Sequence, residues 1–131
     1  MLIKEIMATG TERPMVNEDD CLRDVLDEMN RKGLGAVCVM CGEFLAGLVT
    51  DGDIRRLILS TQKPLPHLFM TPAREVGSKA PKKIRPEATL QEGLAMFEKY
   101  QCWVLPVIDG SNRLLGLVHL HRLLKALIPS T

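Results

Sequence analysis

The string Thr50-Asp51-Gly52-Asp53 places a hydroxyl and two carboxylates at the expected start of a helix. The first backbone N–H groups of a helix have no partner within it, and they favour anionic oxygens such as those of a phosphate. The carboxylate of Asp53 can accept hydrogen bonds from both hydroxyls of a ribose diol. The spacing therefore indicates a place where a phosphate and a ribose could be held.

The same spacing has a structural interpretation. Thr50-x-x-Asp53 is nearly a capping box, in which Thr50 caps the helix and Asp53 returns the hydrogen bond. Arg55 and Arg56 follow on the helix, where either could pair with a phosphate or lie on the exposed surface. Arg56 is three residues beyond Asp53, so these two side chains could also pair with each other. Capping and ligand contact can coexist, and both stay open here.

The corresponding string of the second half is His119-Leu120-His121-Arg122. Two histidines one residue apart on a strand point to the same side, and imidazole is a good ligand for zinc or nickel. No carboxylate or cysteine nearby in the sequence completes such a site, so we expect no metal and a structural or ligand-lining role for His119 and His121. Arg122 stands where the first half has Asp53, and a guanidinium has no acceptor for a ribose hydroxyl.

Cys38-Val39-Met40-Cys41 has the spacing of a redox or zinc motif. On the expected strand, however, positions i and i+3 face opposite sides, so the two thiols cannot share one metal or one disulfide. Cys38 is expected in the core. Trp103, the only tryptophan, has four alternatives: it stacks on a base, plugs a cleft, joins the core or packs in a dimer.

The sequence pattern of the elements that position these residues occurs twice in the chain. Five apolar residues of the first half recur 68 positions later, where Leu22, Leu26, Met29, Val37 and Val39 match Leu90, Leu94, Phe97, Leu105 and Val107. Another five recur 69 positions later, where Gly47, Leu48, Val49, Ile54 and Ile58 match Gly116, Leu117, Val118, Leu123 and Leu127. Such a duplication indicates one small unit made twice, because neither half alone easily buries its apolar faces.

Each half is predicted to run β-α-β-β-α. Periodicity and turn residues predict extended pieces at 15–16 and 83–84, first helices after the cap candidates Asp19-Asp20 and Thr89, strands at 36–40, 44–50, 104–108 and 114–119, and closing helices at 52–60 and 120–128. Five prolines in 61–86 indicate a connecting segment without regular structure. Matching Met7 with Met70 gives the second copy five extra residues before its first helix, so 73–80 is predicted to be a surface loop.

Composition sets the class. The chain has 131 residues and a net charge of +1, which suits one compact α/β domain and recommends neither nucleic acid nor an anionic membrane as a partner. No apolar run reaches the ~20 residues of a membrane span and no signal peptide opens the chain, so we expect a cytoplasmic protein with reduced cysteines. Without a nucleophile elbow or a glycine-rich phosphate loop, we expect no enzymatic turnover.

The string from Gly47 to Arg56, which follows a helix and two short strands and is present twice in outline, resembles the cystathionine-β-synthase (CBS) domain. The resemblance covers the whole chain as a tandem pair. It is strongest to the pair at the C-terminal end of bacterial arabinose-5-phosphate isomerases, on four stretches: 7–14, 31–35, 50–56 and 117–124. The sugar-isomerase domain of those enzymes would lie upstream and is absent.

The resemblance implies an α/β fold of two repeats, 1–62 and 63–131, packed about a pseudo-two-fold axis with clefts between them. It implies a regulatory module that senses an adenine nucleotide (AMP or ATP) or a nucleotide-sugar such as a CMP-sugar, and that needs no cofactor. The expected ligand-binding residues are Thr50, Asp53, Val16, Gly35, Ala36, Arg56, His119 and His121. Expected partners are a second copy, as a homodimer, and a sugar-phosphate isomerase domain. The alternative is an interaction module that dimerises with its clefts empty.

Overall fold

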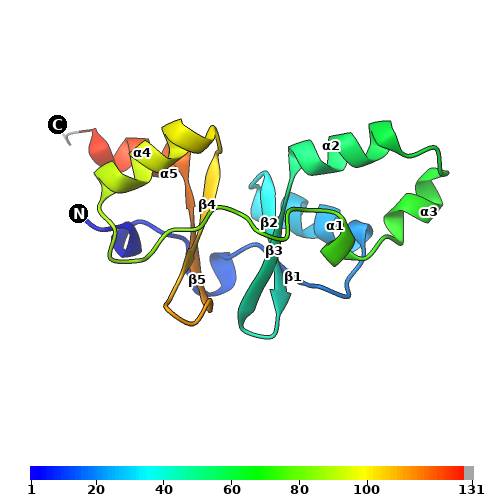
Figure 1. Cartoon of the computed structure of the whole chain (residues 1–131), viewed down its shortest axis with the longest axis horizontal. Coiled ribbons are helices and arrows are strands. Elements are labelled where there is room, and N and C mark those ends of the chain that lie inside the picture. Colours follow the sequence, from blue (N-terminus) through cyan, green and yellow to red (C-terminus); the bar gives the residue numbers. More distant parts are fainter. Residues whose placement is uncertain (129–131) are drawn as a thin grey trace. The chain divides into compact units, whose positions relative to one another are not determined.

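The computed structural model describes residues 1–128 (Figure 1). Its strands are β1 (Met15–Asn17), β2 (Ala36–Cys41), β3 (Phe44–Thr50), β4 (Val104–Ile108) and β5 (Leu114–His119). Its α-helices are α1 (Leu22–Lys32), α2 (Asp51–Ser60), α3 (Leu65–Phe69), α4 (Leu90–Tyr100) and α5 (Leu120–Leu127), with 3₁₀ turns η1 (Ile3–Glu5), η2 (Gly10–Glu12) and η3 (Ala73–Glu75). The predicted α/β order is therefore confirmed, with strand and helix limits within one or two residues.

The chain forms two compact units. The first-repeat unit comprises Pro14–Pro81, and the second-repeat unit comprises Met1–Arg13 together with the chain from Lys82 onward. The predicted division into two repeats at 62/63 is a division of the sequence, and it stays a prediction. The compact units are defined by packing, and their limits lie at 13/14 and 81/82.

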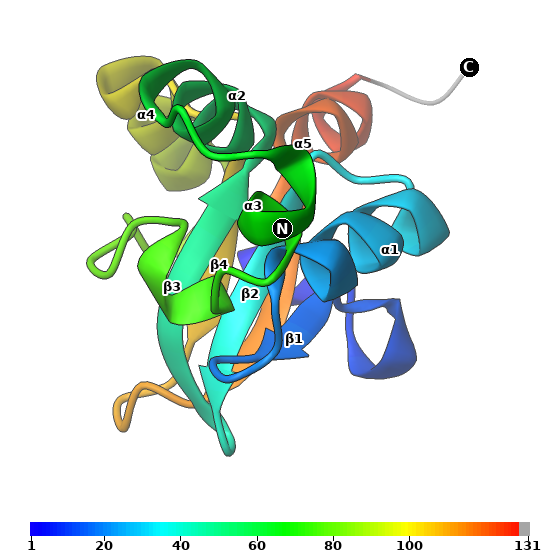
Figure 2. The same ribbon diagram turned by 90° about the vertical axis from the view of Figure 1, so that its right-hand side faces the viewer.

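In the first-repeat unit, β2 is the central strand of a three-stranded sheet. β1 pairs with it in parallel and β3 antiparallel, so that Val16 lies opposite Val39 and Ala36 opposite Thr50. The core below the sheet contains Val25 and Val37, neither of which has any exposed surface. In Figure 2 this unit faces the viewer, and the short α3 is seen beside α1.

In the second-repeat unit, β4 and β5 form an antiparallel pair, and Ile84 adds a parallel bridge to Val107. That bridge is the counterpart of the Val16–Val39 pair of β1 and β2. The predicted extended piece at 83–84 is therefore present as a bridge rather than as a full strand. α4 and α5 cover the core, which includes Leu105 and Leu123.

The segment leading into each repeat packs on the other repeat's elements. η1 and η3 are displaced by 70 positions and make matched hydrogen bonds: the N–H of Ile3 donates to the carbonyl of Ala88 over 2.8 Å, and that of Ala73 to Asp20 over 2.6 Å. Further along, Ala8 bridges to Leu117 of β5. Figure 1 shows the blue N-terminal segment running past β5. In the same way, Ser78 bridges to Leu48 of β3. We call these two segments, 1–13 and 63–81, the exchanged leaders.

This arrangement corrects the prediction built on Met7 and Met70. The hydrogen bonds align Ile3 with Ala73, so the second lead-in is two residues shorter than the first rather than five residues longer. The predicted loop 73–80 is also wrong in part, because Ala73 is fully buried in the core and Ser78 pairs with β3. The prediction that 61–86 lacks regular structure is also wrong, because this segment contains the short helix α3, which begins directly after Pro64, and the 3₁₀ turn η3.

Glycines at equivalent places allow the leaders to lie against the strands. A Cβ at Gly47 would stand 2.7 Å from the carbonyl oxygen of Ser78, and one at Gly116 would stand 2.6 Å from that of Ala8. Both contacts are with backbone, which cannot swing aside as a side chain can. The repeated glycine is therefore explained by close approach of the leader.

Helix caps follow the prediction in one case and not in the other. Thr89 caps α4, accepting a hydrogen bond from the N–H of Glu92 over 3.1 Å. α1 is preceded by Cys21 rather than by the predicted Asp19-Asp20 pair, and the carboxylate of Asp24 accepts from the Cys21 N–H over 2.9 Å. Asp20 instead accepts from the N–H of Asn17 in the turn before the helix.

Within residues 1–128, no helix has the length and apolar character that a membrane crossing requires.

Candidate functional site

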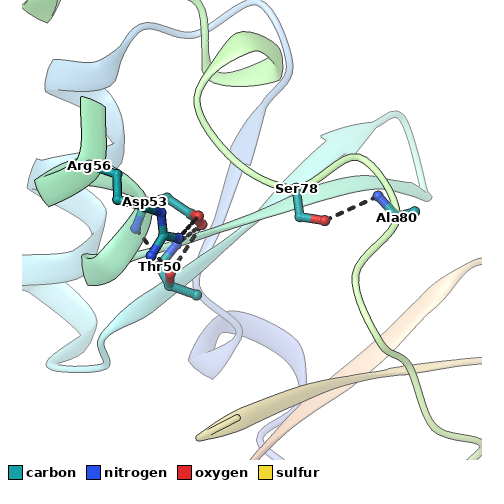
Figure 3. Close-up of polar contacts among 5 residues, drawn as sticks. All are labelled: Thr50, Asp53, Arg56, Ser78 and Ala80. Atoms are coloured by element: carbon teal, nitrogen blue, oxygen red, sulfur yellow. Dashed lines mark hydrogen bonds and ion pairs between the residues drawn. The ribbon is translucent and has the colours of Figure 1, made fainter. Parts of the chain in front are cut away.

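The candidate site is the corner of the first-repeat unit where β3 ends and α2 begins (Figure 3). Thr50 is both the last residue of β3 and the N-cap of α2, and its Oγ1 accepts from the N–H of Asp53 over 3.3 Å. Asp53 returns the bond through Oδ2, which accepts from the Thr50 N–H over 2.9 Å and from the Thr50 hydroxyl over 3.0 Å. The predicted capping box is therefore present.

Arg56 closes the corner from the next turn of the helix. Its Nη2 donates to Asp53 Oδ1 over 2.6 Å, as Figure 3 shows. The Arg56 side chain is 68% exposed, whereas that of Asp53 is 17% exposed. The predicted pairing of these two residues is confirmed, and the Arg56 side chain is the more exposed partner.

Gly52 belongs to this corner, although it was not among the predicted ligand-binding residues. A Cβ at this position would lie 3.2 Å from Arg56 Nη1, so the absence of a side chain lets the guanidinium fold back over the start of the helix. A small residue within the Thr-x-x-Asp string was the available signal. The first turn of α2 thereby places a cation beside backbone N–H groups, which suits an anion.

Three further predicted residues lie on or beside the sheet. Gly35 and Ala36 adjoin the corner, and Val16 lies on β1, opposite Val39 of β2. The carbonyl of Gly35 accepts from the N–H of Asp51 over 3.1 Å, and Ala36 pairs with Thr50 across the sheet. Ala36 has no exposed surface, and Val16 is 8% exposed and packs in the core. Ligand contact by these three residues stays a prediction.

The loop after η3 runs beside β3, and Figure 3 shows Ser78 and Ala80 on it. The N–H and carbonyl of Ser78 bond to Leu48, two residues before Thr50, while its hydroxyl accepts from the N–H of Ala80 over 3.3 Å. No sequence signal placed this serine next to β3, because the bridge joins residues thirty positions apart and uses only backbone groups.

The corresponding corner of the second-repeat unit is built differently. His119 is the last residue of β5 and caps α5, with Nδ1 accepting from the N–H of His121 over 3.0 Å. Burial, together with the charge of His121, holds the pKa of His119 below its ordinary value. Arg122 occupies the helix position that Asp53 has in α2, so this corner lacks a carboxylate acceptor.

The geometric basis of the metal interpretation was wrong, since only His119 lies on the strand and its Nδ1 is engaged as a cap. Among residues 1–128, no three histidine, cysteine or acidic side chains are grouped as a metal site. Cys38 is buried and Cys41 exposed, as their opposite directions on β2 predicted, and neither forms a disulfide.

Trp103 is 70% exposed, so the core alternative for it is wrong. It lines a hollow on the second-repeat unit together with residues of α4 and α5, such as Leu94 and Leu124.

The comparisons agree with this architecture. The family described as CBS domain matches residues 3–60 and 73–129. The arabinose 5-phosphate isomerase KdsD of Francisella tularensis is 33% identical over 127 residues, covering 94% of this chain and 36% of that protein. The Yersinia pestis protein of the same name is 35% identical, with 95% and 37% covered. The chain thus spans little more than a third of the length of these relatives.

Among solved structures, CBSX2 in complex with AMP superimposes with a TM-score of 0.82 at 19% identity, covering 95% of this chain and 94% of that one. At that identity the likeness establishes the fold. Two matched repeats, the β-α-β-β-α order of each and the shared architecture together show that the chain belongs to the CBS domain family, as a tandem pair.

Proposed function

We propose that this CBS pair is a regulatory module that senses an adenine nucleotide or a nucleotide-sugar, such as a CMP-sugar, at the Thr50–Asp53–Arg56 corner. The observation that carries the proposal is the arrangement of a largely shielded carboxylate, an exposed arginine paired with it and a helix start within about one turn. Support from related proteins is the AMP bound in the solved structure of CBSX2.

The hydrogen bonds specify how a ligand would enter. Asp53 Oδ2 already accepts twice from Thr50, and Oδ1 accepts once from Arg56. A carboxylate oxygen has about two acceptor sites, so a ribose diol reaches Asp53 most readily if Arg56 withdraws from Oδ1. The released guanidinium is then available to a phosphate of the same ligand, which it can bind through two parallel N–H groups. Arg56 would thus give up its ion pair with Asp53 and bind the phosphate of the ligand instead.

The test is isothermal titration of the purified chain with AMP, ATP and a CMP-sugar. Asp53→Asn keeps the size of the side chain but removes the charged acceptor, and we expect at least about a tenfold loss of affinity, since hydrogen bonds to charged groups contribute ~1.5–3 kcal/mol. Asp24→Asn is the matched control, because Asp24 bonds to its own helix cap in the same unit but lies on α1. Equal losses in both variants, with folding intact by circular dichroism, would contradict the site.

We further propose that the module controls a sugar-phosphate isomerase of the arabinose-5-phosphate type. The support is the 33–35% identity to relatives that carry that name, over the part that this chain matches. In a chimera, this pair replaces the matching part of the Yersinia pestis isomerase. A nucleotide that binds the isolated chain should then change isomerase activity, and Asp53→Asn should remove the response. Absence of binding to any nucleotide would favour the ligand-free interaction module instead.

A further inference from the structure

The outer edge of β1 in the first-repeat unit is closed by carboxylates of the same chain. The backbone N–H groups of β1 that do not face β2 are those of Met15 and Asn17. The Met15 N–H donates to Glu28 Oε2 over 2.9 Å, and the Asn17 N–H donates to Asp20 Oδ2 over 2.8 Å. Glu28 is only 6% exposed, so its carboxylate is held in place as an acceptor. Both outward N–H groups of this strand are therefore satisfied internally.

The equivalent edge of the second-repeat unit lacks these carboxylates. The bridge of Ile84 to β4 corresponds to the pairing of β1 with β2, so the N–H groups of Lys83 and Arg85 take the outward positions. The residues in the places of the two carboxylates, 68 positions later in the sequence, are Met96 and Ala88. Within residues 1–128, neither outward N–H group has a hydrogen-bond acceptor. We call residues 82–85 the second-repeat edge.

Positive charge surrounds the second-repeat edge. Lys82 and Arg85 are exposed, and Lys83 between them is half-buried. Lys99 of α4 shares the ring of Tyr100 with Lys82, and the two Nζ atoms lie 5.3 and 4.6 Å from the ring centroid. Backbone donors without acceptors and side chains of one charge therefore occur together, a combination that suits carboxylates.

Asp109 does not serve as the missing acceptor. Its charge interacts with that of Arg85, but its Oδ1 accepts from the N–H groups of Ser111 and Arg113, over 2.8 and 3.0 Å. The carboxylate is thus used in its own turn. The positive charge at the second-repeat edge is therefore only partly offset within the chain.

We propose that the second-repeat edge binds an extended acidic segment of another protein, with carboxylates at alternate residues. Alternate side chains of an extended peptide lie on one side, roughly 6–7 Å apart, which is also the spacing of the N–H groups of alternate residues on a strand edge. Two carboxylates of the segment accept from the N–H groups of Lys83 and Arg85, as internal carboxylates do in β1. No residue of the proposed nucleotide corner takes part, so the two proposals stand or fall separately.

Amide hydrogen exchange followed by NMR compares the two edges within one sample. In the free chain, the N–H groups of Lys83 and Arg85 should exchange faster than those of Met15 and Asn17. Lysine and proline on a strand edge can also act only to prevent unspecific pairing, and in that case no peptide should slow the exchange. A peptide that alternates glutamate and valine should slow exchange at Lys83 and Arg85. Protection of these two groups in the free chain, or no protection by the peptide, would overturn the proposal.

Fluorescence anisotropy of the labelled peptide measures the affinity. A peptide with glutamine in place of glutamate should bind at least about tenfold more weakly, because it lacks the charged acceptors. A peptide with the same glutamates in one block tests the spacing, since its net charge is unchanged. It should also bind more weakly, and equal binding of the block peptide would show that charge alone attracts the segment.

Met96→Glu rebuilds at the second-repeat edge the acceptor that Glu28 provides in the first repeat, and it should weaken peptide binding at least about tenfold. Ala88→Asp, the counterpart of Asp20, should act in the same direction and serves if the first variant does not fold. Gln91→Glu is the matched control, because it adds the same charge to an exposed position of α4. Unchanged affinity in the folded edge variants, or an equal loss in Gln91→Glu, would contradict the site.

Discussion

At the scale of single residues, the two repeats solve the same problem with different chemistry. Both closing helices begin directly after a strand, and both need an acceptor for their first N–H groups. The first repeat uses the hydroxyl of Thr50 and the carboxylate of Asp53, whereas the second uses the imidazole of His119. An imidazole caps a helix only while its Nδ1 is unprotonated.

The imidazole cap predicts a pH dependence of stability. The pKa of His119 lies below its ordinary value of 6.5, because burial and the charge of His121 disfavour the protonated ring. The unfolded chain therefore binds this proton more tightly than the folded chain. The stabilisation is fully present above the unfolded pKa and is lost as pH falls through the lower folded pKa.

Urea unfolding at pH 7.5 and at pH 5.5 measures this effect, and we expect a smaller free energy of unfolding at the lower pH. His119→Asn supplies a side-chain oxygen that caps at every pH, so its loss of stability over the same interval should be smaller. An equal loss in both proteins would show that other groups cause the pH dependence.

Much of the candidate site could be predicted at this scale, since Thr50-x-x-Asp53 and the Asp53–Arg56 pairing are local and depend on spacing alone. The cap of α1 could not be predicted. Aspartates are favoured caps and cysteine is not, yet Asp20 is used by the preceding turn and Cys21 takes the cap position. The capping function of His119 was not predicted, because the strand was expected to include both histidines and instead ends at His119, two residues before His121.

At the scale of elements, close backbone contact fixes how each leader lies along its strand. Gly47 and Gly116 are equivalent in the two repeats, and each faces a leader carbonyl at a distance that leaves no room for a Cβ. Strand limits were predictable from alternation and turns. The positions of the leaders were not predictable, because a bridge between two residues uses backbone groups and leaves no pattern in the side-chain types. The match of Met7 with Met70 rested on residue type alone and was misleading.

Gly116→Ala should destabilise the protein by about 1–3 kcal/mol, the usual cost of forcing extra volume into a packed site. The added methyl would displace the leader at Ala8. Thermal or urea unfolding followed by circular dichroism measures the change. Gly110→Ala is the control, because the nearest atom to its Cβ would be a side-chain nitrogen of Arg85 at 3.5 Å, an ordinary contact. Equal stability of the two variants would contradict the role given to the leader.

At the scale of the whole molecule, the core of each compact unit contains residues of one repeat and of the leader that precedes the other repeat. The first-repeat core includes Leu68 and Ala73, which follow the first repeat in the sequence, and the second-repeat core includes Ile3 and Ile6, which precede it by some eighty residues. The duplication itself was evident from residues such as Gly47 and Gly116. The exchange of leaders was not, since either leader could accompany either repeat without changing the sequence pattern.

The exchange predicts which fragment folds. A fragment of residues 14–81 contains the complete first-repeat core, whereas one of residues 1–62 has similar length but lacks Leu68 and Ala73. We expect cooperative thermal unfolding and dispersed amide NMR signals from 14–81 and neither from 1–62. Two equally well folded fragments would show that the leader adds little to the core.

The crossed lead-in segments also bear on how such a gene could be rearranged. Cutting the coding sequence between the two copies and moving one copy elsewhere would separate Ala73 from the core that it fills, and would leave Ile3 attached to the half it does not serve. A transfer that keeps 14–81 in one piece would preserve the first-repeat core, whereas the second-repeat core needs both ends of the chain and cannot be moved as one contiguous piece without carrying 14–81 with it.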